Sequence, residues 1–191
     1  VPTRIEKKDG RYYAIINSLT NSMYLLIYNP VELQLLNAYW SKEHIEDMVS
    51  RLVISCNTEA SLDADQFISH IDFLTYVING MGLMRYDLNT EDSQAITDKT
   101  IMSNIISIAY EYELIDNKQS FYENADSIIS REEAMVILSR CMEVCKIEAQ
   151  PDDENFIKCF EKFIDSDEIS VDLKQMIAHC IKSGIIYGDA K

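Results

Sequence analysis

Cysteine and histidine are the side chains of this sequence that most often bind metals or act as nucleophiles. The five cysteines form no CxxC pair, and the three histidines are scattered singly. Cys141 and Cys145 stand one helical turn apart and could share a metal, but no second pair of ligands accompanies them. We therefore expect buried thiols that pack as small apolar side chains, and no metal or cofactor.

Carboxylates are abundant, but their pattern does not define a catalytic or calcium site. Asp165-Ser166-Asp167-Glu168 resembles the start of a calcium loop, yet Ser170 and Met176 occupy the positions where an EF-hand needs Gly and Glu. Capping of the following helix is the better interpretation. The sequence also has no GxSxG, P-loop or HExxH motif. We predict that the chain is not an enzyme.

The charge balance limits the class of partner. The 191 residues carry a formal net charge of −15, with 32 acidic against 17 basic side chains. This charge argues against binding to nucleic acid or to anionic membrane surfaces. No run of about 18 apolar residues predicts a membrane span. The opening Val1-Pro2-Thr3-Arg4 is no signal peptide, so we expect a segment of a longer precursor with any export signal upstream.

The elements that would position any site begin with β-structure. Arg11–Ile16 and Ser22–Tyr28 are rich in β-branched and aromatic residues, and the polar residues 17–21 between them supply turn chemistry. This pattern predicts a β-hairpin within an N-terminal region spanning residues 1–36.

Beyond this region the apolar period changes to that of a helix, and glycine and proline are scarce. A five-point apolar stripe occurs three times, at Ile45, Met48, Val49, Leu52 and Val53, at Met102, Ile105, Ile106, Ala109 and Tyr110, and at Leu173, Met176, Ile177, Cys180 and Ile181. The recurrence predicts a mainly α fold with three repeats, over residues 37–90, 91–150 and 151–191.

Each of the first two stripes is followed by a polar loop and a second helix with a capped start. Ser69 to Asp72 and Ser130 to Glu133 have the spacing of a capping box. The third copy is partial and has only its first helix. We expect its apolar stripe to be covered by a missing C-terminal helix, by the hairpin or by a partner protein.

Several short motifs in this order resemble those of the S-layer homology family. Ile129-Ser130-Arg131-Glu132-Glu133-Ala134 resembles the Ile-Thr-Arg-Ala-Glu opening of that family's second helix. Tyr39-Trp40-Ser41-Lys42 resembles the aromatic opening of its first helix, and Gly184-Ile185-Ile186-Tyr187-Gly188 resembles the first helix's Gly-Ile-Ile-x-Gly ending. The resemblance covers about residues 20–191.

The resemblance implies three helix-loop-helix lobes in a pseudo-threefold arrangement. It also implies a cell-surface protein that attaches non-covalently to a secondary cell-wall polysaccharide, often pyruvylated. The implied ligand residues are Arg131, Glu133 and the aromatic Trp40, with His70 at the motif arginine's position in the first repeat. Ile101 and Asp172 replace the aromatic residue in the other two repeats, so one groove is expected rather than three.

Alternatives remain for these residues and for the whole chain. Arg131 would be a ligand contact, a solvated first-turn residue or the partner of a nearby Glu or Asp in an ion pair. Trp40 would be a stacking platform, a packed core residue or part of a hydrophobic staple. His70 would be either a ligand contact or a first-turn surface residue. For the chain, the alternative to anchoring is a structural module that has lost polymer binding and serves protein–protein assembly.

Overall fold

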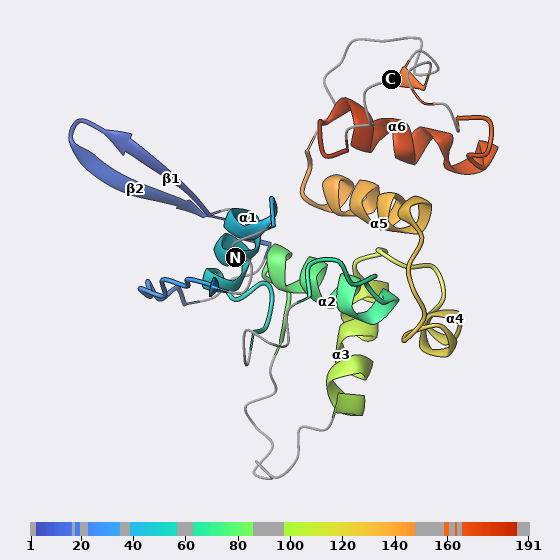
Figure 1. Cartoon of the computed structure of the whole chain (residues 1–191), viewed down its shortest axis with the longest axis horizontal. Coiled ribbons are helices and arrows are strands. Elements are labelled where there is room, and N and C mark those ends of the chain that lie inside the picture. The colour runs from blue at the N-terminus through green and yellow to red at the C-terminus, as the bar shows by residue number, and fades with distance from the viewer. Residues whose placement is uncertain are drawn as a thin grey trace.

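The structure of the chain is a computed structural model that describes residues 3–16, 18–19, 23–34, 39–56, 63–85, 98–147, 159–160, 163 and 166–186. This described part contains six α-helices and an N-terminal two-stranded antiparallel sheet. In Figure 1 the sheet extends to one side of the helices, while α5 and α6 lie one above the other. The prediction of a helical chain with an N-terminal hairpin is therefore confirmed. The predicted boundaries after residues 36, 90 and 150 lie outside the described residues.

The hairpin pairs different strands from those predicted. Strand β2 (Arg11–Ile16) pairs with β1 (Thr3–Lys8), which precedes it, rather than with Ser22–Tyr28. The turn is Asp9-Gly10, and both residues have positive φ, 52° and 75°. Asp-Gly is a strongly favoured two-residue hairpin turn, so this local signal prevails over the longer polar loop that was expected to form the turn. The described residues 23–34 contain no strand.

The first predicted apolar stripe is only partly helical. Helix α1 (Lys42–Ser50) ends before Leu52, which has a positive φ of 60° and is exposed. Only Val49 of this stripe is buried, in a small cluster with Leu33. This cluster also includes the partly buried Ile45 and Tyr39.

Helices α2 (His70–Met81) and α3 (Asp98–Glu111) build the largest core cluster of the described residues. Its most deeply buried members include Leu74 and Ile78 from α2 and Ile105 and Ile106 from α3. The second predicted stripe thus faces the core, except that Tyr110 is half exposed. Each Leu or Ile side chain that is fully buried contributes about 1.5–3 kcal/mol to folding.

The loop predicted between α3 and the next capped helix contains a helix of its own. Helix α4 (Lys118–Glu123) begins after Asn117, whose side-chain oxygen accepts hydrogen bonds from the backbone N–H groups of Gln119 and Ser120. Asparagine is a strong N-cap residue, so Asn117 carried a local signal for this helix.

Helix α5 (Arg131–Val144) is buried on two sides. Ile137 and Cys141 pack into the cluster built by α2 and α3, whereas Met135 and Met142 pack against α6 (Lys174–Lys182). The third predicted stripe is covered in this way, because Ile177 and Cys180 are buried against α5. The cover expected from a further helix, the hairpin or a partner is therefore provided by α5.

Five of the described helices, α1, α2, α3, α5 and α6, share one ending. In each, a residue with positive φ is followed by an apolar residue whose N–H donates to the carbonyl five positions back: Val53 to Met48, Leu83 to Ile78, Leu114 to Ala109, Ile147 to Met142 and Ile185 to Cys180. This is the hydrogen bond of a Schellman motif. The positive φ falls on Gly82 and Gly184 after α2 and α6 but on Leu52, Glu113 and Lys146 after α1, α3 and α5. None of the described helices is long and apolar enough to span a bilayer.

Candidate functional site

The starts of α2 and α5 are joined by backbone pairing, although about 60 residues separate them in the sequence. Ser69 and Ile128 form an isolated antiparallel bridge. The N–H of His70 donates to the carbonyl of Ser127 at 3.0 Å, and the N–H of Ile129 donates to the carbonyl of Ile68 at 3.1 Å. The two capped helix starts are therefore held side by side.

A complete capping box fixes the start of α5. The hydroxyl of Ser130 accepts from the N–H of Glu133 at 3.1 Å, and Oε2 of Glu133 accepts from the N–H of Ser130 at 2.9 Å. The Ser130 hydroxyl also donates to the same carboxylate at 2.6 Å. This hydroxyl is the main cause of a lowered pKa for Glu133, with smaller contributions from the Ser130 N–H and from His70, while partial burial acts in the opposite direction.

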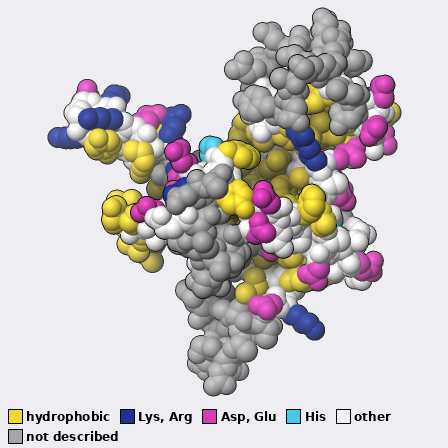
Figure 2. Space-filling view, viewed as in Figure 1, with side chains coloured by type: hydrophobic (Ala, Val, Ile, Leu, Met, Phe, Trp, Pro, Cys, Tyr) yellow, Lys and Arg dark blue, Asp and Glu magenta, His cyan; other side chains and the backbone are white. Residues whose placement is uncertain are grey.

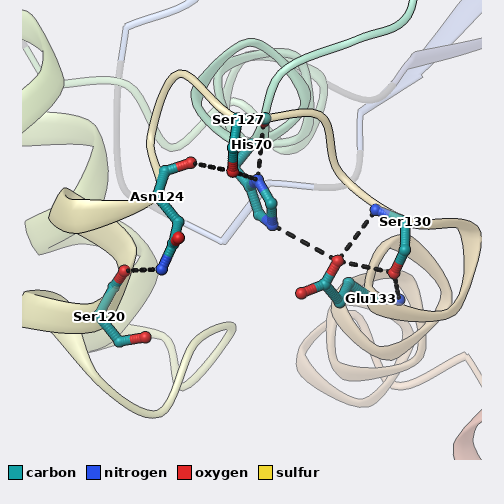
Figure 3. A network of polar contacts seen from close by, with 6 residues as sticks. All are labelled: His70, Ser120, Asn124, Ser127, Ser130 and Glu133. Atoms are coloured by element: carbon teal, nitrogen blue, oxygen red, sulfur yellow. Dashed lines mark hydrogen bonds and ion pairs between the residues drawn. The ribbon is translucent and has the colours of Figure 1, made fainter.

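His70 connects the two helix starts, as Figure 3 shows. Its Nδ1 lies 2.9 Å from the carbonyl oxygen of Ser127, and its Nε2 lies 3.5 Å from Oε2 of Glu133. The edge of the ring packs against Phe121 of α4, with centroids 5.6 Å apart. A doubly protonated ring would donate to both oxygens, whereas a neutral ring can donate to only one. His70 is buried at this junction.

The network continues from His70 into the loop after α4. The Ser127 hydroxyl donates to the carbonyl of Asn124 at 2.8 Å, and the Asn124 side-chain amide donates to the carbonyl of Ser120 at 2.9 Å. These bonds, also drawn in Figure 3, fix the loop between α4 and α5.

This junction forms one wall of a groove of about 580 Å³ between α2, α4 and α5. The groove is lined by hydroxyl and amide side chains, by apolar residues and by four titratable groups. Its polar and aromatic lining includes His70, Asp116, Asn117, Ser120, Phe121, Asn124, Ser127, Glu133 and Arg140.

Arg140 is the one arginine or lysine among the described lining residues. Its guanidinium donates to Oδ2 of Asp116 at 2.6 Å and to the carbonyl of Leu114 at 3.2 Å. The Arg140 side chain is 17% exposed, whereas that of Asp116 is 82% exposed. The guanidinium is thus held in place while its carboxylate partner is open to solvent.

The structure brings together two of the four residues that the sequence singles out. His70 and Glu133 line the groove. Arg131 is the exposed first residue of α5 and is not among the described lining residues. Its neighbour Glu132 accepts from the N–H of Ser170 at 3.0 Å, which places this side of the helix start near the segment before α6.

Trp40 lies in a different part of the molecule. It precedes α1, is 88% exposed, and makes an edge contact with His44 at a centroid distance of 6.4 Å. The sequence alternatives for this residue were stacking and core packing, and its exposure is incompatible with core packing. It is not among the described residues that line the groove.

Sequence reasoning missed Arg140, Phe121 and Asn124 as groove residues. Arg140 stands in the middle of a helical pattern, and nothing in its neighbours signals that it reaches Asp116, 24 positions earlier. Phe121 and Asn124 belong to α4 and its following loop, which only the Asn117 cap could have indicated.

Two of the five cysteines are buried thiols, as expected. Cys141 and Cys180 are buried, and burial raises their pKa values to about 12 and about 11. Cys56, Cys145 and Cys159 are partly buried. Within the described part of the chain, no three His, Cys, Asp or Glu residues are grouped to hold a metal. Neither a family model, nor a curated protein, nor a solved structure matches the chain.

Proposed function

We propose that this chain is a divergent S-layer homology module that attaches an exported protein to the bacterial cell surface. In this proposal the groove between α2, α4 and α5 binds a secondary cell-wall polysaccharide, often pyruvylated. The observation that carries the proposal is the joining of the two capped helix starts, Ser69–His70 and Ser130–Glu133, beside that groove. These are the positions where the family motif occurs in the first and second repeats.

In this proposal the helices α1, α3 and α6 begin the three repeats, because they lie at the three apolar stripes of the sequence. The helices α2 and α5 then supply the second helix of the first two repeats. The proposed arrangement is pseudo-threefold, with the third repeat represented by α6.

The groove chemistry suits a carbohydrate that carries acidic groups. Asn117, Asn124 and Ser120 supply amide and hydroxyl groups for sugar hydroxyls, and Phe121 supplies an aromatic surface. Arg140 is the cation that a ligand carboxylate would contact, because a guanidinium binds a carboxylate in a two-pronged, charge-assisted manner. A ligand carboxylate would take the place of the exposed Asp116 on Arg140.

Arg131 and Trp40 are secondary candidates in this proposal. Arg131 combines a guanidinium with the positive end of the α5 dipole and is the motif residue of the second repeat. Trp40 presents an exposed aromatic face, but on a different part of the chain from Arg140. If Arg131 bound the ligand and Arg140 did not, the site would lie on the side of the α5 start where Glu132 contacts Ser170.

The test is binding of the full chain to purified secondary cell-wall polysaccharide over a range of ionic strength. The range matters because salt weakens the contact of Arg140 with a ligand carboxylate but also screens the repulsion between a −15 protein and an acidic polymer. We expect Arg140→Gln to weaken binding at least about tenfold, the equivalent of about 1.4 kcal/mol. Arg85→Gln is the matched control, because Arg85 also pairs with a carboxylate, Glu111, but does not line the groove.

Absence of binding by the wild-type chain at every ionic strength tested would overturn the anchoring proposal. The assembly alternative would then be favoured by a separate observation, the exposure of a short apolar segment. Met23, Leu25, Leu26 and Tyr28 are each at least 86% exposed. Such a segment is expected to be covered by another protein surface.

A further inference from the structure

The β-hairpin, residues 3–16, is an arm that carries exposed apolar side chains on both of its faces. The register places Ile5, Tyr12 and Ile16 on one face, and they are 60%, 72% and 39% exposed. The other face carries Lys8 and Arg11 together with Tyr13 and Ile15, which are 46% and 41% exposed. All of β2 and all of β1 except Thr3 are exposed. A two-stranded sheet without packing is marginally stable in water, so the arm is suited to burial against another surface.

The arm is basic in an otherwise acidic protein. It contains four basic side chains and two acidic ones, whereas the whole chain has a net charge of −15. Lys8 and Arg11 stand directly opposite each other next to the turn. Like charges in this position are destabilising, so the hairpin alone gives no reason for the pair. Figure 2 shows the Lys and Arg side chains gathered on the arm and the Asp and Glu side chains spread over the helices.

A hollow of about 650 Å³ on the helical part has the opposite character. It lies between α1, the segment before α2 and the segment before α5. Its apolar lining includes Phe67 and Ile128, which are 77% and 61% exposed, and its carboxylates are Asp63, Asp72 and Asp126. No lysine or arginine is among the described residues that line it.

The carboxylates of this hollow affect a tyrosine that shares its lining. The pKa of Tyr76 is raised, first by burial and then by the charge of Asp72. Because no lysine or arginine is among the described lining residues, an incoming basic group would meet negative charge together with exposed apolar surface. Both properties match one face of the arm, which carries Lys8 and Arg11 beside Tyr13 and Ile15.

We propose that the arm of one copy of this chain docks into the acidic hollow of a second copy. The arm contributes Lys8 and Arg11 to face Asp63 and Asp126, and Tyr13 and Ile15 on the same face of the arm cover Phe67 and Ile128. The arm and the hollow are different surfaces of the same chain, so the contact is heterologous and joins copies head to tail. The contact lies outside the groove of Arg140 and does not depend on polymer binding.

A charge swap tests this docking in the full-length chain. One variant carries Lys8→Glu and Arg11→Glu, which keeps a like-charged pair next to the turn and so changes the hairpin's own stability little. The other carries Asp63→Lys and Asp126→Lys at two exposed positions. Analytical ultracentrifugation over a range of concentration and salt measures association, and far-UV circular dichroism checks that each variant is folded.

The wild-type chain is expected to exceed its monomer mass of 22.0 kDa at low salt and to dissociate as salt is added. Each double variant alone should associate at least about tenfold more weakly, because like charges then meet. An equimolar mixture of the two variants should recover association, since both possible arm–hollow pairs become complementary. The control Lys99→Glu with Lys146→Glu has the same net charge as the arm variant and should behave as the wild type.

A wild-type chain that remains monomeric at low salt and high concentration would overturn the proposal. So would failure of the mixed variants to associate, or an equal loss of association in the Lys99→Glu, Lys146→Glu control. Polymer binding by the Arg140 groove is measured separately, so failure of this docking leaves the anchoring result unaffected.

Discussion

The arm and the helical body use the same kinds of apolar side chain in opposite ways. In the body, Leu74 and Ile78 are completely buried between α2, α3 and α5. In the arm, Ile5 and Tyr12 are mostly exposed. Folding free energy therefore resides in the body, whereas the apolar surface of the arm can contribute only when another molecule covers it. The types of apolar residue alone do not distinguish the two regions.

The largest expected difference between the regions is in the free energy of unfolding. Leu74→Ala should lower it by about 3 kcal/mol, because a cavity forms in the core of α2 and α3. Leu25→Ala, at a side chain that is 86% exposed, should change it by less than about 0.5 kcal/mol. Urea unfolding followed by circular dichroism measures both. Similar losses in the two variants would mean that residues 23–28 pack against the body in solution.

Within the body, the joined helix starts should contribute less than the core. Ser130→Ala removes the hydroxyl that accepts from the N–H of Glu133 and should cost about 1 kcal/mol. The same urea measurement applies. Ser103→Ala is a suitable control on the exposed side of α3, where the serine bonds only to the Tyr122 hydroxyl among the bonds described. A cost at Ser130 no larger than at Ser103 would contradict the capping box.

A stabilising change is expected where a helix ending carries a side chain at positive φ. Glu113 has φ of 57° and follows α3, in the position that Gly184 occupies after α6. Glu113→Gly should raise the unfolding free energy by up to about 1 kcal/mol, because glycine adopts this conformation without steric cost. Thermal melting should show a Tm higher by a few degrees. An unchanged or lower Tm would show that the Glu113 side chain makes a compensating contribution.

The smallest effect is expected in the pH dependence of the free energy of unfolding, through Glu133 at the joined helix starts. Because the fold lowers the pKa of Glu133, its carboxylate stabilises the folded state above the unfolded pKa of about 4.5. This contribution is lost as the pH falls through the lower folded-state value. Glu133→Gln should therefore be less stable than the wild type at pH 7 and should lose less stability between pH 5 and pH 3. Parallel stability curves for the two proteins over this interval would contradict the assignment.

The local features of the fold could be predicted from the sequence because their causes are local. Ser69 and Ser130 cap α2 and α5 as their spacing to Asp72 and Glu133 indicated. The apolar stripe of α3 also faces the core as its period indicated. The hairpin was assigned the wrong partner strand, although Asp9-Gly10 is itself a local signal that should have taken precedence.

The site depends on contacts between distant segments, and these could not be predicted. The pairing of Ile68 with Ile129 is made by backbone groups, which carry no sequence signal. Arg140 contacts Asp116 and Leu114, which lie in the segment between α3 and α4 and precede it by more than 20 positions. His70 and Glu133 were predicted as ligand residues, but their contact with each other follows from the backbone pairing of Ile68 with Ile129.

Hydrogen exchange of the full chain, with and without purified secondary cell-wall polysaccharide, compares the body and the arm in one measurement. Polymer binding in the groove predicts slower exchange in the amides of residues 114–128 and at the start of α5, which surround the groove, and unchanged exchange in residues 3–16. Protection confined to residues 3–16, or no protection anywhere over the range of ionic strength, would contradict anchoring through this groove.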